Sequence, residues 1–168
     1  MRTRLTALLS ATLLALTGGL SAAEATAAPR TAAWDDPVIC YSAYNASLGW
    51  DTMETCNGLA SGIPGHELQA LRLSAYGVGT LCARADLEVI GWQAWQCSGT
   101  DWGEIQIGST TANRGIRAIE FTVTTATLTA EVHLSGGSGW QGPVQGTSVR
   151  VGAPGGVRTV ESIGISVI

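Results

Sequence analysis

The sequence predicts an all-β domain, and three observations support that prediction. Apolar and polar residues alternate in short segments rich in Val, Ile, Thr and aromatic residues, the pattern of strands with one buried face. Gly, Ser and Asn separate these segments, as turns between strands require. A Gly-Trp pair occurs three times, and its tryptophans are 42 and 48 residues apart. The pairs are Gly49-Trp50, Gly91-Trp92 and Gly139-Trp140.

The first 37 residues are not expected to belong to this domain. Residues 1–27 begin with two arginines, continue with a run of Leu, Ala and Thr, and end in small residues. This order is typical of a secretory signal peptide. The expected cleavage follows Ala27, with Ala23 as the alternative, and residues 28–37 then form a linker. We therefore expect a secreted, extracellular protein without a membrane span.

Residues 38–168 are interpreted as three copies of one unit of about 45 residues. The copies span about 38–79, 80–125 and 126–168. One such unit is too small to bury its own core. We therefore expect a single domain in which the three copies pack with pseudo-threefold symmetry, as in a β-prism or a β-trefoil. Closure would also remove the exposed edges of an open sheet.

Each copy is expected to contain a strand before its Gly-Trp pair and another at its end. The first strands lie in ICYSAYNASLGW, LCARADLEVIGW and LTAEVHLSGGSGW. The last strands lie in HELQALRLSAYGV, NRGIRAIEFTVTT and GVRTVESIGISVI, whose apolar residues match position by position. The stretch PGHELQALRLSAY also fits a helix by its periodicity, but its counterparts in the other copies indicate a strand.

Four cysteines occupy matching places in the first two copies. Cys40 and Cys82 lie in the first strands, while Cys56 and Cys97 follow their Gly-Trp pairs by nearly equal distances. Of three possible connectivities, this symmetry favours Cys40 with Cys56 and Cys82 with Cys97, and export makes oxidation expected. A metal site is the alternative, but the chain has no Cys-x-x-Cys motif. Neither a metal nor a cofactor is expected.

Charge and motif content argue against several functions. The formal net charge is −4, and all nine basic residues are arginine. A basic stripe for nucleic acid or an anionic membrane is therefore missing. The segment GGSGW resembles a nucleophile elbow only loosely, and no other catalytic motif is evident. We expect a protein that is not an enzyme.

The Gly-Trp segments carry a family resemblance. The third copy reads EVHLSGGSGWQ, and the second reads IGWQ and then IGSTT. With the alternating strand that follows, the region from Ile39 to the C-terminus resembles three copies of the clostridial hydrophobic repeat with a Trp, the ChW or hydrophobic W family. His133 matches the His of that repeat, whereas Tyr44 and Asp86 replace it and Asp51 replaces the Gln. The resemblance implies a secreted or surface protein linked to cell-wall or glycan attachment, with no established catalytic residues.

Tryptophans and their polar neighbours are the candidates for ligand contact. An indole face stacks on the C–H surface of a sugar, and a few polar groups fix the hydroxyls. The three repeated tryptophans are nevertheless expected chiefly as a core layer, with ligand contact as the alternative. Trp95 and Trp102 lack counterparts and are better candidates for exposed contacts. The full set is Trp50, Asp51, Trp92, Gln93, Trp95, Trp102, His133, Trp140 and Gln141.

Two functions are consistent with these candidates. The first is a non-catalytic binding module for cell-surface glycan or peptidoglycan, with several weak sites that act together. The second is a secreted protein-interaction domain, such as an inhibitor of an extracellular protease, which would use the loop between Cys82 and Cys97. A glycan binder should carry equivalent residues in all three copies, whereas an inhibitor should concentrate unusual residues in one loop.

Overall fold

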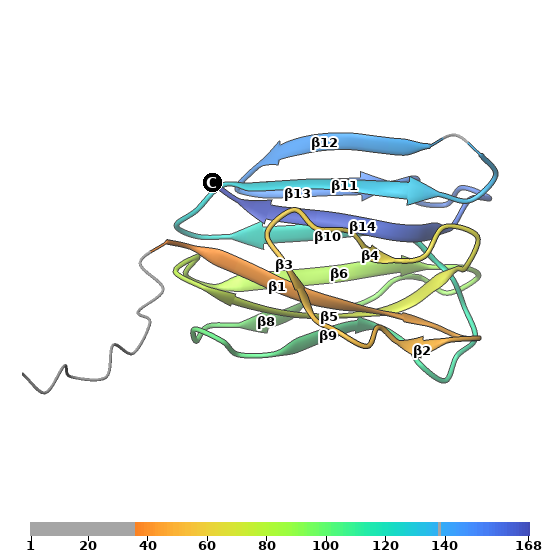
Figure 1. Cartoon of the computed structure of the whole chain (residues 1–168), viewed down its shortest axis with the longest axis horizontal. Coiled ribbons are helices and arrows are strands. Elements are labelled where there is room, and N and C mark those ends of the chain that lie inside the picture. Colours follow the sequence, from red (N-terminus) through yellow and green to blue (C-terminus); the bar gives the residue numbers. More distant parts are fainter. Residues whose placement is uncertain (1–35, 138) are drawn as a thin grey trace, which may run out of the picture. The chain divides into compact units, whose positions relative to one another are not determined.

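The computed structural model describes residues 36–137 and 139–168, which form β-strands and no helix (Figure 1). The all-β prediction is therefore confirmed. Among these residues, no helix is present that could cross a membrane. The predicted signal peptide and residues 28–35 of the predicted linker lie outside the described residues.

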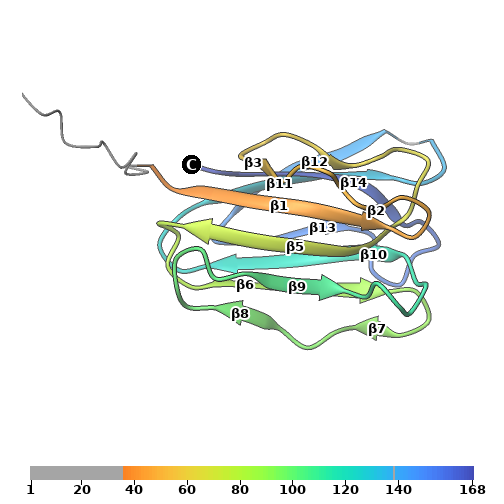
Figure 2. The same cartoon turned by 60° about the horizontal axis from the view of Figure 1, so that its bottom comes forward.

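Hydrogen bonds divide the strands into three antiparallel sheets (Figures 1 and 2). Sheet I has the order β2-β1-β5-β9, with β3 also paired to β1, and consists of β1 (Val38–Asn45), β2 (Gly49–Trp50), β3 (Thr55–Cys56), β5 (Leu68–Tyr76) and β9 (Ile105–Gly108). Sheet II has the order β13-β10-β6-β7, with β8 also paired to β6, and consists of β6 (Leu81–Leu87), β7 (Gly91–Trp92), β8 (Gln96–Ser98), β10 (Ile116–Val123) and β13 (Ser148–Gly152). Sheet III has the order β12-β11-β14-β4 and consists of β4 (Ser61–Gly62), β11 (Leu128–Leu134), β12 (Trp140–Gly146) and β14 (Val160–Val167).

Each sheet takes one strand from another part of the chain. The strand β9 pairs with β5 in sheet I, β13 pairs with β10 in sheet II, and β4 pairs with β14 in sheet III. The same pairing order thus occurs three times. The interpretation of the three segments as sequence copies around a threefold axis stays a prediction.

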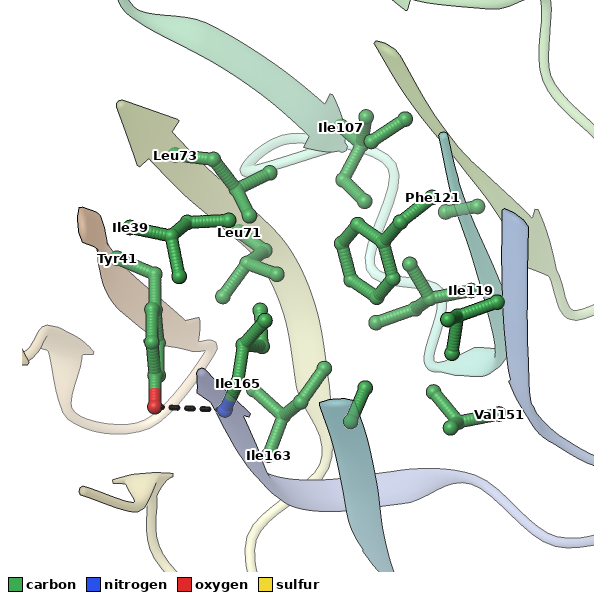
Figure 3. Packing of buried hydrophobic residues seen from close by; sticks show 14 of the residues in the cluster. Ile39, Tyr41, Leu71, Leu73, Ile107, Ile119, Phe121, Val151, Ile163 and Ile165 are labelled. Atoms are coloured by element: carbon green, nitrogen blue, oxygen red, sulfur yellow. Dashed lines mark hydrogen bonds between the residues drawn. The ribbon is translucent and has the colours of Figure 1, made fainter. Parts of the chain in front are cut away.

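Hydrogen bonds do not close these strands into a barrel, so sheet edges remain, for example at β2, β7 and β12. The sheets are held together by side chains instead. Their inward faces form one hydrophobic core with residues from β1, β5, β9, β10, β13 and β14 (Figure 3). Tyr41 lies in this core, where its hydroxyl donates to the Leu59 carbonyl oxygen and accepts from the Ile165 N–H at 2.8 Å. Burial raises the pKa of Tyr41.

We call β4, β9 and β13 the exchanged strands, because each pairs in a sheet built mainly from another part of the chain. Each of them requires glycine where it ends. Gly62, Gly108 and Gly152 end β4, β9 and β13, and their φ values are +89°, +79° and +89°. A Cβ at any of the three would collide with a backbone carbonyl oxygen of the neighbouring strand. Both the dihedral angle and the close approach therefore exclude a larger residue without rearrangement.

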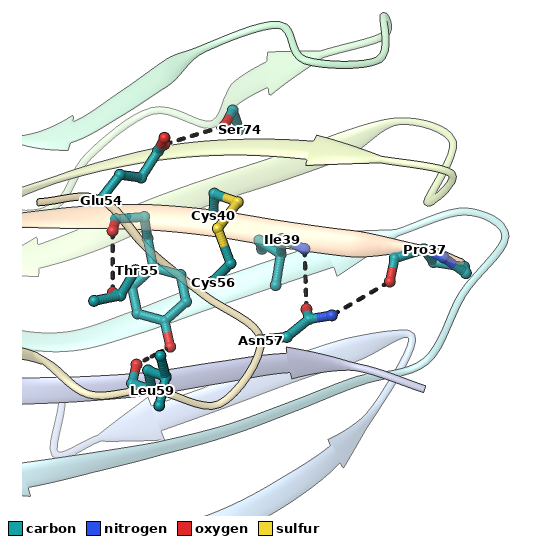
Figure 4. Close-up of a disulfide and its surroundings, with 10 residues drawn as sticks. Pro37, Ile39, Cys40, Glu54, Thr55, Cys56, Asn57, Leu59 and Ser74 are labelled. Atoms are coloured by element: carbon teal, nitrogen blue, oxygen red, sulfur yellow. Dashed lines mark hydrogen bonds between the residues drawn. A yellow bond between two sulfur atoms is a disulfide. The ribbon is translucent and has the colours of Figure 1, made fainter. Parts of the chain in front are cut away.

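Both predicted disulfides are present, and the metal alternative is wrong for these cysteines. Cys40–Cys56 joins β1 to β3 (Figure 4), and Cys82–Cys97 joins β6 to β8. In each case the two cysteines are direct cross-strand partners. Sheet III has Thr129 opposite Gln145 at the corresponding place.

Candidate binding site around the Gly-Trp pairs

The Gly-Trp pairs occupy the same place in all three sheets. Each follows a hairpin turn, and its tryptophan pairs across the strands with the residue at the position of the repeat histidine. The glycine at the turn has a positive φ, +83° at Gly49, and no atom lies within 4 Å of a Cβ built there. Its role is therefore the backbone conformation of the turn. The cross-strand pairs are Tyr44 with Trp50, Asp86 with Trp92 and His133 with Trp140.

The prediction that the repeated tryptophans form a core layer is wrong. Trp50 and Trp92 are half-buried, and Trp140 is 43% exposed. The cause is strand register, because directly paired residues lie on one face of a sheet. The inward positions are taken by the residues that precede the paired ones, namely Ala43, Ala85 and Val132, each fully buried.

Two arginines that the sequence pattern did not indicate cover two of these tryptophans. The Arg72 guanidinium carbon lies 4.1 Å from the Trp50 ring centroid. The Arg84 carbon lies 4.7 Å from the ring centroids of both Trp92 and Trp95. Such contacts are cation–π interactions. They give the indoles fixed neighbours without burying them in the core.

A charge network fills the outward face of sheet II. Glu120 on β10 pairs with Arg84 at 2.5 Å and also with Arg150. Burial alone would raise the pKa of the Glu120 carboxyl, but hydrogen bonds from Arg150 and Arg84, together with their charges, outweigh it, so the pKa lies below its ordinary value. Both oxygens of this carboxylate are thus paired, Oε2 with Arg84 and Oε1 with Arg150. Glu120 therefore offers little to a cationic ligand.

Asp51 and Gln93, both predicted as ligand contacts, hold the exchanged strands. Asp51 Oδ2 accepts from the Ser61 hydroxyl at 2.6 Å and from the Gly62 N–H at 2.9 Å. Gln93 Oε1 accepts from the Gly108 N–H at 2.7 Å. Within the described part of the chain, the exposed Gln141 side chain makes no hydrogen bond. Two of the three polar neighbours thus have a structural role.

The residues that pair across the strands with Trp92 and Trp140 have different polar partners. His133 Nδ1 lies 3.0 Å from Glu161 Oε2, and the His133 ring meets Trp140 edge-on. Asp86 binds Arg117 at 2.9 Å and accepts from the Gly155 N–H at 2.9 Å. Equivalent ligand contacts in all three sheets are therefore not expected from these side chains.

The exposure predicted for Trp95 and Trp102 is confirmed, at 40% and 42%. Their surroundings differ, however. Trp95 lies against Arg84 of sheet II, whereas Trp102 stacks on Tyr76 with a centroid distance of 5.8 Å. The segment that carries both tryptophans therefore presents two different surfaces.

A groove beside β2 brings two predicted residues together. Trp50 and Asp51 both line it, and its volume is about 350 Å³. The apolar side chains of this groove could not be predicted from the sequence, because they lie in irregular connections and carry no periodic pattern. These are Leu48, Met53 and Ile63, which are 52%, 76% and 45% exposed. Thr52 and Thr55 add hydroxyl groups to the lining.

No group of three His, Cys, Asp or Glu side chains that could hold a metal ion occurs in residues 36–137 and 139–168. In comparisons with known proteins, no family model, curated protein or solved structure matches the chain.

Proposed function

We propose that the protein is a secreted, non-catalytic binding module for a cell-surface or cell-wall glycan. The observation that carries this proposal is the groove beside β2, which both Trp50 and Asp51 line. Its volume of about 350 Å³ suits a small ligand, and it combines apolar surface with a few polar groups. Such a combination suits a sugar, which has apolar C–H faces and hydroxyl edges.

Trp50 provides the apolar part of this proposed site. Arg72 lies over its ring at 4.1 Å, and Tyr44 packs edge-on with a centroid distance of 5.3 Å. Both contacts restrict the indole, so little side-chain entropy is lost when a ligand packs against it. Trp50 is half-buried and lines the groove.

Asp51 provides the polar part. Its Oδ2 atom is fixed by two hydrogen bonds from β4, whereas Oδ1 accepts none from the described residues. A carboxylate oriented in this way accepts a hydrogen bond from a sugar hydroxyl. The same residue would thus hold β4 with one oxygen and the glycan with the other.

Secretion is supported by the two disulfides, because such bonds are typical of proteins in oxidising compartments. The resemblance to the hydrophobic W repeat also supports a role at the cell surface. The partner proposed here is peptidoglycan or another surface glycan, and neither nucleic acid nor a membrane.

The apolar rim of the groove favours a second candidate function, a protein-interaction domain. Leu48, Met53 and Ile63 form an exposed apolar surface next to Trp50. Clustered exposed apolar side chains are typical of protein interfaces. A secreted protein with an apolar side chain that inserts into the groove would be the partner in this case.

A titration with soluble peptidoglycan fragments, followed by calorimetry, distinguishes the two candidates. For a glycan module we expect Trp50→Ala to weaken binding about fivefold, since stacking on an aromatic ring contributes about 1 kcal/mol. Trp140→Ala is the matched control, because Trp140 is exposed and lies outside the groove. Circular dichroism confirms that both variants fold.

Met53→Ser tests the protein-interaction alternative, because the 76% exposed Met53 has little role in folding. Failure of every glycan fragment to bind, with capture of a secreted protein that Met53→Ser abolishes, would replace the first function with the second. Equal glycan affinities of wild type and Trp50→Ala would show that the groove is not the glycan site.

A further inference from the structure

A second depression, on sheet III, contains a carboxylate without a partner. Its volume is about 220 Å³. Glu131 on β11 is the charged residue in its lining, and the side chain is partly exposed. Within residues 36–137 and 139–168, the Glu131 carboxylate makes no hydrogen bond or ion pair. A carboxylate at the wall of a depression that makes no such contact is able to pair with a ligand that carries positive charge.

The depression exists because sheet III lacks a side chain that the other two sheets have. Glu131 faces Gly164 across the strands β11 and β14. The corresponding pairs are Ser42 with Arg72 in sheet I and Arg84 with Glu120 in sheet II. Arg72 and Glu120 cover their sheets, whereas Gly164 has no side chain, and Glu131 Oε1 lies 3.4 Å from the place that a Cβ on Gly164 would take.

Sheet III also lacks a disulfide at this depression, and two hydroxyl residues lie there instead. Thr129 pairs with Ser166, whereas the corresponding pairs contain Cys40 and Cys82. Both Thr129 and Ser166 line the depression. Neither hydroxyl makes a hydrogen bond with another residue that the structure describes. Two hydroxyl groups are therefore available beside the carboxylate.

The edge strand β12 forms the opposite wall. Its register with β11 shifts between Ala130 and Val132, opposite Glu131. At this shift a Cβ on Gly142 would lie 3.0 Å from the Cβ of Glu131, so the chain passes close to the acid. Pro143 follows and lines the depression. Glu131 has no cross-strand partner on β12, and the β12 backbone thus encloses it on that side.

The chemistry of the lining selects the ligand. A primary ammonium group has three N–H donors and one positive charge, which match one carboxylate and two hydroxyl groups. A Ca²⁺ ion requires about six to eight oxygen ligands, commonly from several carboxylates. The residues described here offer no group of three such side chains. The volume of about 220 Å³ suits an ammonium-bearing end group rather than a whole large ligand.

We propose that the depression beside Glu131 binds the primary ammonium group of a ligand, carried either by an amino sugar or by a lysine-type side chain. The carboxylate pairs with the ammonium, and Thr129 and Ser166 accept the remaining N–H groups. This site lies on sheet III and is independent of the groove beside β2.

The experiment is an NMR titration of the ¹⁵N-labelled protein in the Trp50→Ala background, which removes the contribution of the other groove. The probes are the glucosamine trimer, its fully N-acetylated form, and Nα-acetyl-lysine amide. We expect amide shifts at Glu131 and Gly164 with the ammonium probes and none with the N-acetylated trimer. Comparison of the two ammonium probes identifies the source of the ammonium group.

Two variants test whether Glu131 is responsible. Glu131→Gln keeps the shape but removes the charge, and it should weaken binding at least about tenfold. Gly164→Arg places a cation beside Glu131, as Arg72 is placed in sheet I, and should abolish binding. Glu104→Gln is the matched control, since this exposed acid lies outside the depression.

Three outcomes would overturn the proposal. These are the absence of shifts with both ammonium probes, equal binding of the N-acetylated trimer, and unchanged binding in Glu131→Gln. None of them affects the glycan proposal, because that proposal concerns Trp50 and the groove beside β2.

Discussion

Gln93 holds the backbone of Gly108 on the neighbouring sheet by two hydrogen bonds. The Gly108 N–H donates to Gln93 Oε1 at 2.7 Å, and Gln93 Nε2 donates to the Gly108 carbonyl oxygen at 3.3 Å. Asp51 binds the Gly62 N–H in the same way at 2.9 Å. A residue directly after a repeated tryptophan thus fixes an exchanged strand. This relationship links the Gly-Trp pairs to the assembly of the three sheets.

Replacement of Gln93 by alanine should therefore destabilise the protein, because it leaves the N–H of Gly108 without its acceptor. The expected loss in the free energy of unfolding is about 1–3 kcal/mol. Gln141→Ala is the matched control, since its side chain is exposed and makes no hydrogen bond within the described residues. Urea denaturation measures both variants, and similar losses would contradict a structural role specific to Gln93.

A third disulfide should form when Thr129 and Gln145 are both replaced by cysteine. The two residues are cross-strand partners at the place where sheets I and II carry disulfides. Their separation in sequence is 16, the same as that of Cys40 and Cys56. Closing a loop of this length stabilises a protein by up to about 3 kcal/mol. Thiol titration and urea denaturation, with and without reductant, measure the effect.

The single variant Thr129→Cys is the control for this change and should show one free thiol and no such gain. The double variant should also weaken the binding of the glucosamine trimer, because Thr129 lines the depression beside Glu131. Two free thiols in the double variant under oxidising conditions would show that the third sheet has a different local geometry.

The ion pairs of Glu120 should make the stability of the protein sensitive to acid. The pKa of Glu120 in the folded protein lies below its ordinary value of 4.5. The ionised carboxylate therefore contributes its full stabilisation above about pH 4.5, and this contribution is lost as the pH falls through the folded-state pKa. Glu120→Gln should remove that part of the pH dependence.

Urea denaturation of wild type and Glu120→Gln at a series of pH values checks this sign. The difference in the free energy of unfolding should stay constant above about pH 4.5 and shrink below it. Glu104→Gln is again the control, because the exposed Glu104 lies 3.8 Å from its arginine partner. A difference that grows on acidification would contradict the assignment.

Features with a local pattern could be predicted from the sequence. Alternation of apolar and polar residues predicts the long strands, such as β5 and β10, because it depends only on the period of a strand. The pairing of Cys40 with Cys56 and of Cys82 with Cys97 could be predicted because their nearly equal spacings, 16 and 15 residues, reflect equivalent positions in the two sheets. Exposure of Trp95 and Trp102 was predicted from their lack of counterparts.

Features set by contacts between distant segments could not be predicted. The strand β4 has two residues, and its partner β14 lies about a hundred residues further along the chain. No pattern in Ser61–Gly62 indicates this pairing. The exposed position of Trp140 depends on its register with His133. A role for Glu131 could not be predicted from the sequence, because it depends on the pairing of Glu131 with Gly164 on a distant strand.

The exchange of β4, β9 and β13 makes the three sheets depend on one another in a closed cycle. A linear array of repeats loses or gains an end unit with little harm, because each unit contacts only its neighbours. Here, deletion of any one segment would remove an edge strand from a sheet whose other strands come from elsewhere. The domain is therefore expected to unfold in a single cooperative transition. Loss or gain of one sheet during evolution is not expected, because each sheet needs a strand from another.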